Sequence, residues 1–379
     1  MKILHIINGL SNGGTEGVLY RLINGDNKNQ HFVISLTDLG VYGQKLIENQ
    51  ICVKQINLSK NIMLPKKLLL IYLHVKKIHP DLIQTWMYHS DLVGGIIAKL
   101  LRINSIVWGI RNSNLDKSNV PFSTRLIAKI NAISSNYIPN QIISCSIEAK
   151  KIHHKLGFNE EKITVIPNGY DLNKFRPINK SRVSLRSKLG LTEDVFLMGM
   201  VARWHKHKDH QNLFKALNLL NKTSELDWKM IIIGHDINKS NLELISLLKS
   251  FNLLDKVIIL EQRLDIEVVY SAIDLHILSS LGEAFPNVVA EAMSSETPCI
   301  STDVGDASFI IGSTGWLSRP KDFMHLNEVI SLAIDEFFFN RSEWNDRKLK
   351  CRKRINDKFS LKTMVNNYHD LWNDVHDRQ

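Results

Sequence analysis

Two glutamates, Glu283 and Glu291, stand eight residues apart on either side of Pro286. Proline suits the first turn of a helix, where its missing N–H has no partner to lose, so we expect Pro286 to open a helix. The amides of Asn287 and Val288 would then point out of the helix end and form an anion site. A diphosphate held there would lie between the two carboxylates. A nucleotide sugar has this layout, although two glutamates beside an amphipathic helix can also be solvated surface groups.

Two cations follow a buried strand that we predict at residues 196–201. They are Arg203 and Lys208, and they would lie at the carboxyl end of that strand, where open α/β sheets bind their ligands. Arg203 offers a planar fork of donors and Lys208 a compact point charge. Together they could neutralise a diphosphate and then the charge that develops as a sugar–phosphate bond breaks.

A glycine-rich loop at residues 8–17 follows the first predicted strand and opens a helix, which is where a phosphate-binding loop would lie. The loop lacks the G-x-G-x-x-G spacing, and no P-loop lysine follows it, so the sequence disfavours dinucleotide and triphosphate binding. Gly14 is either a point of close approach to a ligand or part of a tight structural turn.

With these segments the chain resembles the retaining nucleotide-sugar glycosyltransferases of family 4, of the bacterial surface-polysaccharide type. The resemblance also includes residues 165–175 and covers nearly the whole chain, with residues 279–305 as its most specific part. It implies the GT-B fold, an α/β architecture in which two Rossmann-like, doubly wound parallel-sheet domains face a central cleft.

The resemblance implies a role for each motif residue. Arg203 and Lys208 would hold the donor diphosphate, Glu283 would contact the donor sugar, and Glu291 would bind the ribose hydroxyls. Gly14 would let the backbone approach the donor across the cleft between the domains. Asn287 and Val288, at the start of the glutamate helix, complete the expected donor site.

Three further candidates each keep a structural alternative. Arg263 follows a predicted strand and falls where relatives hold the nucleotide base. His89 could orient the acceptor hydroxyl or the donor sugar, but a lone histidine is often a packing residue. Arg111 is a second candidate for the acceptor side. It stands near the position at which many relatives have a histidine, so the role of that histidine is not transferred to Arg111.

The chain departs from the family pattern at three places. Ala202 and Ala284 replace glycines, which should preserve both loops. The helix that carries Glu291 has no glycine at its end, where the chain reads Ser-Ser-Glu-Thr-Pro over residues 294–298. A left-handed cap would strain Glu296 by roughly 1 kcal/mol, so we expect a differently closed turn.

Composition excludes several classes of protein. The four cysteines lie far apart without a C-x-x-C pair, which predicts a reducing, cytoplasmic compartment. The first apolar run is too short for a signal peptide, and no uncharged run reaches the length of about 18 residues that a membrane span needs. No D-x-D motif is present, and Asp265-Ile266-Glu267 should begin a helix. Because Arg203 and Lys208 already bring positive charge to a diphosphate, we expect no metal ion and no cofactor.

The net charge of +10 belongs to the first half of the chain, since residues 1–175 contain 21 Lys and Arg against 11 Asp and Glu. This excess predicts attraction to the anionic inner face of the cytoplasmic membrane, with solubility as the alternative explanation. No nucleic-acid recognition motif is present, so we expect no nucleic-acid partner. The residues that would carry the attraction are Lys66, Lys67, Lys76, Lys77, Lys150, Lys151, Lys155 and an apolar-basic helix at 122–137.

Apolar strand-like runs alternate with helix-length segments along the chain, which indicates parallel sheets covered on both faces. We expect an acceptor-binding domain at residues 1–175, a nucleotide-sugar-binding domain at 176–355 with a linker at 171–181, and a C-terminal helix within 356–379 that packs back on the first domain. The expected strands are 2–7, 31–36, 52–57, 82–85, 105–108, 141–145 and 163–166, then 196–201, 229–233, 257–260, 275–278 and 299–302.

The sequence therefore predicts a retaining, metal-independent glycosyltransferase. It would move a hexose or N-acetylhexosamine from a nucleoside diphosphate, a UDP-sugar in preference to a GDP-sugar, to a glycan acceptor carried on polyprenyl diphosphate. Surface polysaccharide assembly, of capsule or lipopolysaccharide, is the setting that the resemblance implies. Two alternatives stay open: a nucleotide-sugar epimerase of the same architecture, and a non-catalytic subunit that binds glycan or scaffolds a complex.

Overall fold

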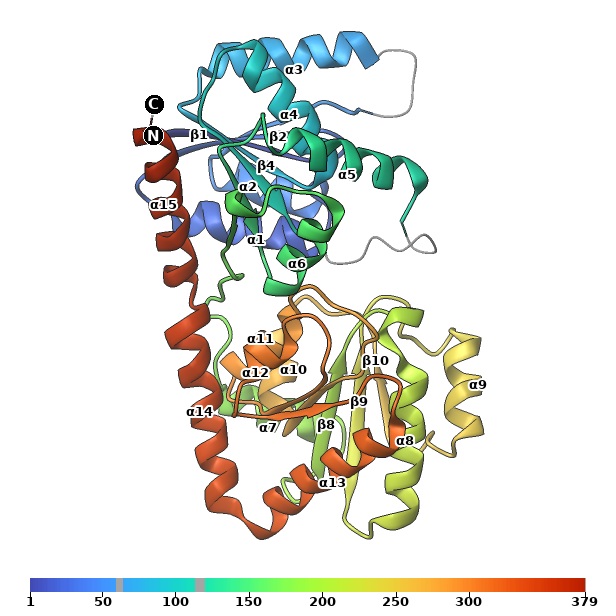
Figure 1. The fold of residues 1–379 in the computed structure, drawn as a ribbon. Helices are drawn as coiled ribbons and strands as arrows, with labels where there is room; N and C mark the ends of the chain where they lie inside the picture. Colours follow the sequence, from blue (N-terminus) through green and yellow to red (C-terminus); the bar gives the residue numbers. More distant parts are fainter. Residues whose placement is uncertain (59–63, 113–119, 379) are drawn as a thin grey trace. The chain divides into compact units, whose positions relative to one another are not determined.

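The computed structural model describes residues 1–58, 64–112 and 120–378. The chain divides into two compact units, one made of Met1–Gly169 with Leu361–Gln379 and the other of Tyr170–Ser360. These boundaries lie a few residues from the junctions expected after residues 175 and 355. Each unit is built around one parallel sheet flanked by helices (Figure 1).

The sheet of the first unit has seven strands in the order β3-β2-β1-β4-β5-β6-β7, all paired in parallel. Parallel strands need helical crossovers, which is why strand and helix alternate along the chain. The strands are β1 Lys2–Ile7, β2 Gln30–Ser35, β3 Cys52–Gln55, β4 Leu82–Trp86, β5 Ile106–Ile110, β6 Gln141–Ser144 and β7 Ile163–Val165.

Helices bury both faces of this sheet. Alternate side chains of β1 point to opposite faces, so Ile3 and Ile7 belong to one apolar core while Leu4 and Ile6 belong to another. The first core is shared with α1, α2 and α15, and the second with α3, α4, α5 and α6. The helices are α1 Gly14–Gly25, α2 Gly40–Glu48, α3 Leu64–Ile78, α4 Tyr88–Leu100, α5 Phe122–Ser134, α6 Ile147–Leu156, the short 3-10 helix η1 Glu160–Lys162, and α15 Leu361–Asp377.

The last helix, α15, belongs to the first unit although it follows the second in sequence. It packs against α1 and lies within the range 356–379 expected for the C-terminal helix. Its apolar side chains recur at helical spacing, which produces a stripe that enters the sheet core. His369 adds a polar contact, because its Nε2 lies 2.8 Å from the buried Asp26 carboxylate. The stripe consists of Met364, Val365, Tyr368, Leu371, Trp372 and Val375.

The second unit has a six-stranded parallel sheet in the order β10-β9-β8-β11-β12-β13. Five of its strands begin and end within one residue of the predicted positions. The edge strand β13 was not predicted, because it contains only two apolar residues, Trp316 and Leu317. The strands are β8 Phe196–Val201, β9 Trp228–Ile233, β10 Val257–Leu260, β11 Leu275–Leu278, β12 Cys299–Thr302 and β13 Trp316–Ser318.

The helices of the second unit cover both faces of its sheet. The first of them begins at Asn179, so the last three residues of the predicted linker are helical. The helices are α7 Asn179–Lys188, the 3-10 helix η2 Lys206–Lys208, α8 His210–Thr223, α9 Leu242–Ser250, α10 Ile266–Ala272, α11 Asn287–Ser294, α12 Ala307–Ile311, α13 Phe323–Phe339 and α14 Arg341–Phe359.

Candidate active site

An ion pair joins two of the predicted site residues at the carboxyl edge of the second sheet. The Nζ atom of Lys208 lies 2.5 Å from Oε1 of Glu283, and both side chains are largely buried, with 21% and 16% of their surface exposed. The hydroxyl of Ser280 donates to the same carboxylate oxygen at 2.7 Å. The ammonium group of Lys208 and the hydroxyl of Ser280 thus hold the Glu283 carboxylate in place without a ligand.

Backbone contacts fix the two loops that carry this pair. The amide of Leu281 donates to the carbonyl of His207 at 2.8 Å, and the hydroxyl of Ser279 donates to the carbonyl of Lys208 at 2.9 Å. The loop after β8 and the loop after β11 therefore form one surface, because β8 and β11 are neighbours in the sheet.

Two glycines, one after β9 and one after β12, allow neighbouring loops to lie close to these two. Gly234, directly after β9, has a φ of +156°, and a Cβ there would lie 2.1 Å from the carbonyl oxygen of Ala202. Gly305, after β12, has a φ of +57°, and a Cβ there would lie 2.2 Å from the carbonyl oxygen of Glu283. Only glycine fits at either position. Neither glycine was predicted as part of the site, although a glycine within a few residues of a strand end is a signal that the sequence contains.

Arg203 lies in the same loop as Lys208 and is exposed to solvent. Within the described ranges its side chain makes no hydrogen bond or ion pair, so its donors are available to a ligand. Partial burial and the charges of Arg203, His207, Lys206 and Lys208 lower the pKa of His205. The loop after β8 concentrates positive charge, because it contains Arg203, Lys206 and Lys208.

The helix α11 presents its first and fifth residues, Asn287 and Glu291, to two tyrosines. The hydroxyl of Tyr170 donates to Oδ1 of Asn287 at 2.5 Å, and the hydroxyl of Tyr270 donates to Oε2 of Glu291 at 3.2 Å. Burial, and then the Glu291 carboxylate, raise the pKa of Tyr270 well above its ordinary value, so it remains a donor. Neither tyrosine was predicted to take part in the site, although Tyr170 lies in a segment that carries the family resemblance.

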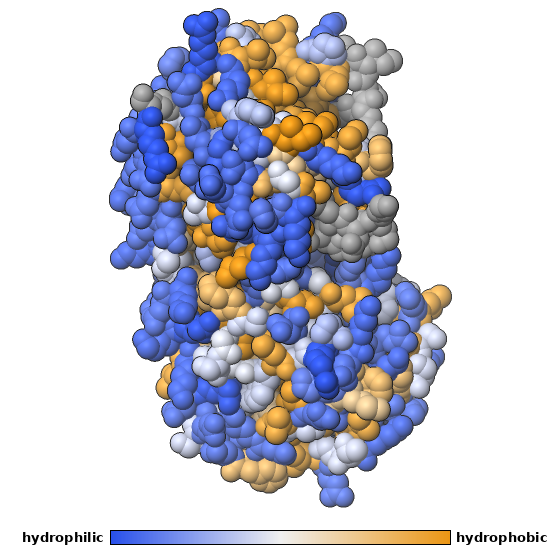
Figure 2. All heavy atoms as spheres, viewed as in Figure 1, coloured by the Kyte–Doolittle hydropathy of each residue, from blue (hydrophilic) through white to orange (hydrophobic). Residues whose placement is uncertain are grey.

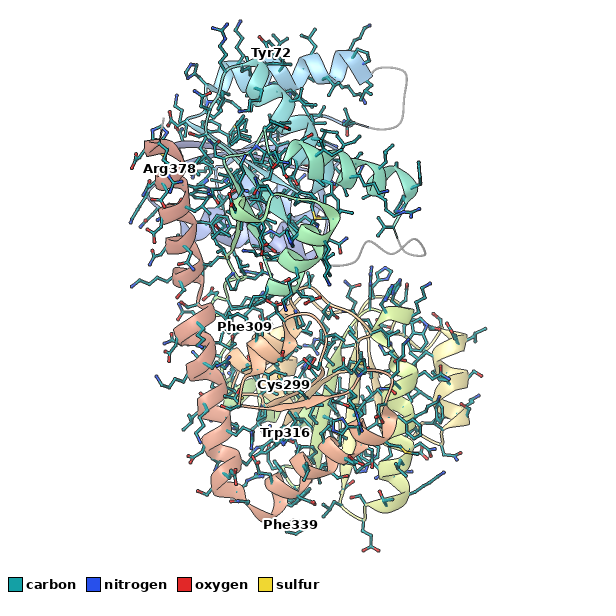
Figure 3. The ribbon with its side chains drawn as sticks, in the orientation of Figure 1. Tyr72, Cys299, Phe309, Trp316, Phe339 and Arg378 are labelled. Atoms are coloured by element: carbon teal, nitrogen blue, oxygen red, sulfur yellow. The ribbon has the colours of Figure 1, made fainter. Side chains whose placement is uncertain are left out.

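The start of α11 differs slightly from the prediction. Pro286 is the N-cap residue, with φ −72° and ψ 92°, and the helix begins one residue later at Asn287. The amides of Asn287 and Val288 still occupy the first turn, where an α-helix has no carbonyl to pair with them. The helix rests on β12, where the buried thiol of Cys299, labelled in Figure 3, donates to the carbonyl of Val289 at 3.6 Å.

The end of α11 contradicts the prediction. Glu296 adopts the left-handed conformation, with a φ of +61°, that we expected the chain to avoid. The amide of Glu296 donates to the carbonyl of Met293, and the amide of Thr297 donates to that of Ala292, both at 3.1 Å. These bonds form the Schellman motif that commonly ends a helix at glycine. The hydrogen bonds of the motif offset the strain at a non-glycine residue.

Arg263 has a local partner. Its guanidinium donates two hydrogen bonds to Asp265, at 2.8 Å and 2.6 Å, and this pairing raises the pKa of the arginine. The residue lies in the loop between β10 and α10. The ion pair with Asp265 is enough to explain the position of the Arg263 side chain without a ligand. A contact between Arg263 and the nucleotide base stays a prediction.

In the first unit, Gly14 and His89 both lie at the carboxyl edge of the sheet. Gly14 is the first residue of α1, and the neighbouring Thr15 hydroxyl lies 4.0 Å from Sδ of Met87. Met87 precedes α4 with a φ of +77°, a strained backbone for a side-chain-bearing residue. His89 follows in the first turn of α4, half-buried, and burial lowers its pKa, so the imidazole is neutral at pH 7.

Arg111 is held within the first unit by three contacts. Its guanidinium lies over the ring of Trp86, 4.5 Å from the centroid, and donates to Oδ1 of Asn168 at 2.9 Å. It also donates to the hydroxyl of Tyr368 on α15. These contacts attach the C-terminal helix to the edge of the sheet, a structural role that the sequence analysis did not predict. An acceptor-binding role for Arg111 stays a prediction.

Among residues 1–58, 64–112 and 120–378, no group of three or more His, Cys, Asp or Glu side chains could hold a metal ion. No helix in these ranges is both long and apolar enough to cross a membrane.

Two family patterns match the chain, one in each unit. The family described as Glycosyltransferase Family 4 matches residues 12–174, and the family described as Glycosyl transferases group 1 matches residues 181–345. The two matches meet close to the boundary between the units.

Curated relatives and a solved structure agree with these matches. The chain is 27% identical over 327 residues to the UDP-Gal:alpha-D-GlcNAc-diphosphoundecaprenol alpha-1,3-galactosyltransferase of Escherichia coli, covering 85% of this chain and 82% of that protein. It is 25% identical over 319 residues to the capsular polysaccharide biosynthesis glycosyltransferase CapM of Staphylococcus aureus, covering 81% and 80%. HepE of Anabaena, solved in complex with UDP, superposes with a TM-score of 0.86 at 20% identity, covering 99% of this chain and 100% of HepE.

The superposition confirms the predicted α/β fold with two Rossmann-like parallel sheets. The family matches confirm the predicted resemblance, and the relatives include enzymes of polysaccharide and capsule biosynthesis. The chain belongs to the family 4 glycosyltransferases and has their GT-B fold.

Proposed function

We propose that this glycosyltransferase moves a hexose or N-acetylhexosamine, with retention of anomeric configuration, from a UDP-sugar to a hydroxyl of a glycan carried on polyprenyl diphosphate. The observation that carries the proposal is the Lys208–Glu283 pair beside the start of α11. It brings together, in one unit, a cation for the donor diphosphate and an acid for the donor sugar.

The roles follow from the chemistry of each side chain. The diphosphate binds Arg203, Lys208 and the first amides of α11, because all three provide positive charge or N–H donors. When a phosphate takes the Lys208 ammonium, the Glu283 carboxylate is released to accept hydrogen bonds from the donor sugar. Glu291, held by Tyr270, accepts hydrogen bonds from the ribose hydroxyls.

The reaction needs no protein nucleophile. The bond between the anomeric carbon and the diphosphate oxygen breaks, and the acceptor oxygen forms its bond to the same carbon on the same face. The acceptor proton passes to the departing diphosphate oxygen. Arg203 and Lys208 stabilise the negative charge that develops on that oxygen, the electrostatic contribution that is usually the largest in such a site.

The relatives support the choice of substrates. The Escherichia coli relative is named for a UDP-sugar donor and a diphosphoundecaprenol-linked acceptor, and HepE was solved with UDP and with UDP-glucose. His89 and Arg111 of the first unit are the proposed acceptor-side residues. An acceptor on a lipid diphosphate would place the enzyme at the anionic inner face of the cytoplasmic membrane, to which the basic first half of the chain would be attracted.

The test is a panel of UDP- and GDP-sugars offered with polyprenyl-diphosphate-linked acceptors, with the product identified by mass spectrometry and its anomeric configuration by NMR. Transfer with retention, undiminished in EDTA, is the expected result, since Arg203 and Lys208 supply the charge that a divalent ion would otherwise bring. An inverted product, or donor consumed without any acceptor, would refute the proposal. Turnover lost in EDTA and restored by magnesium would refute its metal independence.

A further inference from the structure

Helix α3 exposes leucines on the side that faces solvent. Leu69, Leu70 and Leu73 are 56%, 38% and 51% exposed, while Ile71 and Val75 of the same helix fill the core. A surface helix of a soluble protein is usually apolar on its core side alone. α3 is therefore apolar on two sides, with its lysines at the two ends of the exposed stripe.

Helix α5 repeats this pattern. Leu126, Ile130 and Ile133 recur at helical spacing and are 47%, 39% and 71% exposed, while Ala128 and Ala132 face the core. The helix ends at Ser134, so Tyr137, which we predicted to lie in it, follows the helix. Two helices on one face of the first sheet thus expose an apolar stripe each.

Helix α4 lies between them and packs against both. An open groove of about 520 Å³ runs between α3 and α4, and its walls are entirely apolar. Leu69 and Tyr72 line it from α3, and Val93, Ile96 and Leu100 line it from α4. In Figure 2 hydrophobic side chains gather over these helices at the top of the view, and Figure 3 labels Tyr72 there. We call the exposed apolar side chains of α3, α4 and α5 the α3–α5 surface.

The exposed charges on the three helices of the α3–α5 surface are of one sign. The three helices contain a single acidic residue, Asp91, which is fully buried. Burial raises the pKa of Asp91 to about 8, so this carboxyl carries little negative charge at neutral pH. The basic residues of the three helices are Lys66, Lys67, Lys76, Lys77, Lys99, Arg125 and Lys129.

Leucines in the middle of a positive rim match one kind of partner. Anionic lipid headgroups attract the lysines, and the boundary between headgroups and acyl chains accepts the apolar side chains. A charged surface that served solubility alone would have no reason to expose a contiguous apolar patch. A nucleic acid would pair with the lysines and leave the leucines in water.

We propose that the first unit docks on an anionic bilayer through the α3–α5 surface, with the leucines and isoleucines of α3, α4 and α5 inserted at the level of the headgroups. This inference rests on the proposed function, because the membrane is the partner that would carry the lipid-linked acceptor. The contact is apolar as well as electrostatic, so it persists in part at a salt concentration that screens the lysines.

The test is co-sedimentation of the full chain, without donor, with vesicles of phosphatidylglycerol and phosphatidylethanolamine and with vesicles of phosphatidylcholine alone. We expect binding to the anionic vesicles only. Leu69→Gln/Leu73→Gln should weaken it by about tenfold or more at low and at high salt. Lys76→Gln/Lys77→Gln should weaken it by about fivefold for each lysine, at low salt only.

Matched controls come from the second unit. Leu242 and Leu332 are 80% and 57% exposed on α9 and α13, so Leu242→Gln/Leu332→Gln removes a similar apolar area elsewhere. Lys222→Gln/Lys239→Gln removes two exposed charges from the same unit. Both double variants should bind vesicles as the unaltered chain does. Circular dichroism and thermal melting show that each variant is folded.

A fluorescent probe reports insertion directly. Cys52 is exposed and the other three cysteines are buried, so a Cys52→Ser chain can be labelled at a single new position. An environment-sensitive fluorophore on Leu73→Cys should shift to the blue on anionic vesicles, whereas one on Leu242→Cys should not.

The outcomes separate the docking from the enzymatic proposal. Vesicle binding that the α3 variants leave unchanged, or no binding by the unaltered chain, overturns the docking. A dimer in solution that Leu69→Gln/Leu73→Gln dissociates, without vesicle binding, also overturns it and makes the surface an interface between copies. Transfer to a short water-soluble acceptor tests the enzyme separately, because it should survive in the α3 variants. Binding without any transfer would refute the proposed function alone.

Discussion

At the scale of single residues, the proposed donor site is a set of mostly paired groups. Lys208 is neutralised by Glu283, Glu291 accepts from Tyr270, and Arg203 alone among these has no partner within the described residues. Because the second unit already orders most of these side chains, little conformational entropy is lost when a ligand replaces their partners.

Replacing either donor cation should reduce the rate of transfer. Arg203→Ala or Lys208→Ala should raise the activation free energy by about 2–4 kcal/mol, which lowers kcat/KM roughly 30- to 1000-fold. Each variant removes a preorganised positive group that stabilises the developing negative charge. Steady-state kinetics with the preferred UDP-sugar measures the effect. Lys206→Ala is the matched control, since Lys206 is an exposed lysine of the same loop with no assigned role. Normal turnover in the Arg203 or Lys208 variant would contradict the assignment.

Tyr270 should act on the donor through Glu291. Tyr270→Phe removes the hydroxyl that orients the carboxylate and little else, so KM for the donor should rise about tenfold, which corresponds to the loss of a hydrogen bond to a charged group of roughly 1.5 kcal/mol. The value of kcat and the melting temperature should change much less. Tyr137→Phe, at a residue that is 77% exposed, should leave all three unchanged. An equal fall in kcat would place Tyr270 in the chemical step instead.

At the scale of elements, α11 carries three residues of the proposed donor site and is followed by a strained residue. Its last turn is closed by the bonds from the amides of Glu296 and Thr297, and Glu296 itself is the left-handed residue. The prediction of a differently closed turn was wrong, because the strain of about 1 kcal/mol is opposed by the two hydrogen bonds that the motif gains. Together the two hydrogen bonds contribute more free energy than the strain costs.

Glu296→Gly should therefore stabilise the second unit. Glycine adopts a positive φ without steric cost, so the variant should gain about 1 kcal/mol and melt a few degrees higher, with unchanged transfer activity. Ser295→Gly is the matched control, because Ser295 has a φ of −88° and gains nothing from glycine. The control should leave the melting temperature unchanged or lower it. A destabilised Glu296→Gly chain would show that the glutamate side chain itself holds the turn.

At the scale of the whole molecule, buried histidines make the stability depend on pH. Burial, and then the charge of Lys208, lower the pKa of His210 and of His276 to about 3. An unfolded histidine takes up a proton below about pH 6.5, whereas these two remain neutral in the folded chain. The unfolded state therefore binds more protons between these values. Stability is at its full value above about pH 6.5 and falls as the pH is lowered toward 3.

His276→Phe should flatten this dependence. Neither ring nitrogen of His276 has a hydrogen-bond partner among the described residues, so phenylalanine removes no bond. The free energy of unfolding should fall by about 1.4 kcal/mol less for each pH unit below about 6 than it does in the unaltered chain. Urea denaturation at several pH values measures this slope. His235→Phe, at an exposed histidine, should keep the original slope. Equal slopes in all three proteins would mean that His276 is protonated when folded.

The sequence by itself determined the periodic parts of this protein. Apolar runs marked twelve strands because parallel strands are buried on both faces. The order of Arg203, Lys208 and Glu283 after predicted strands placed them at one edge of a sheet, where the structure pairs Lys208 with Glu283. The strand β13 carries no such run, because it has only two apolar residues in succession.

Only the tertiary structure decided which groups pair. Tyr270 meets Glu291 across 21 residues, Arg111 meets Tyr368 across 257, and Gly305 makes room for the backbone of Glu283. Each contact depends on where a separate element lies in the folded unit. Local propensity and periodicity contain no information about such distances, because they describe a residue's own element and not the neighbour that folding brings against it.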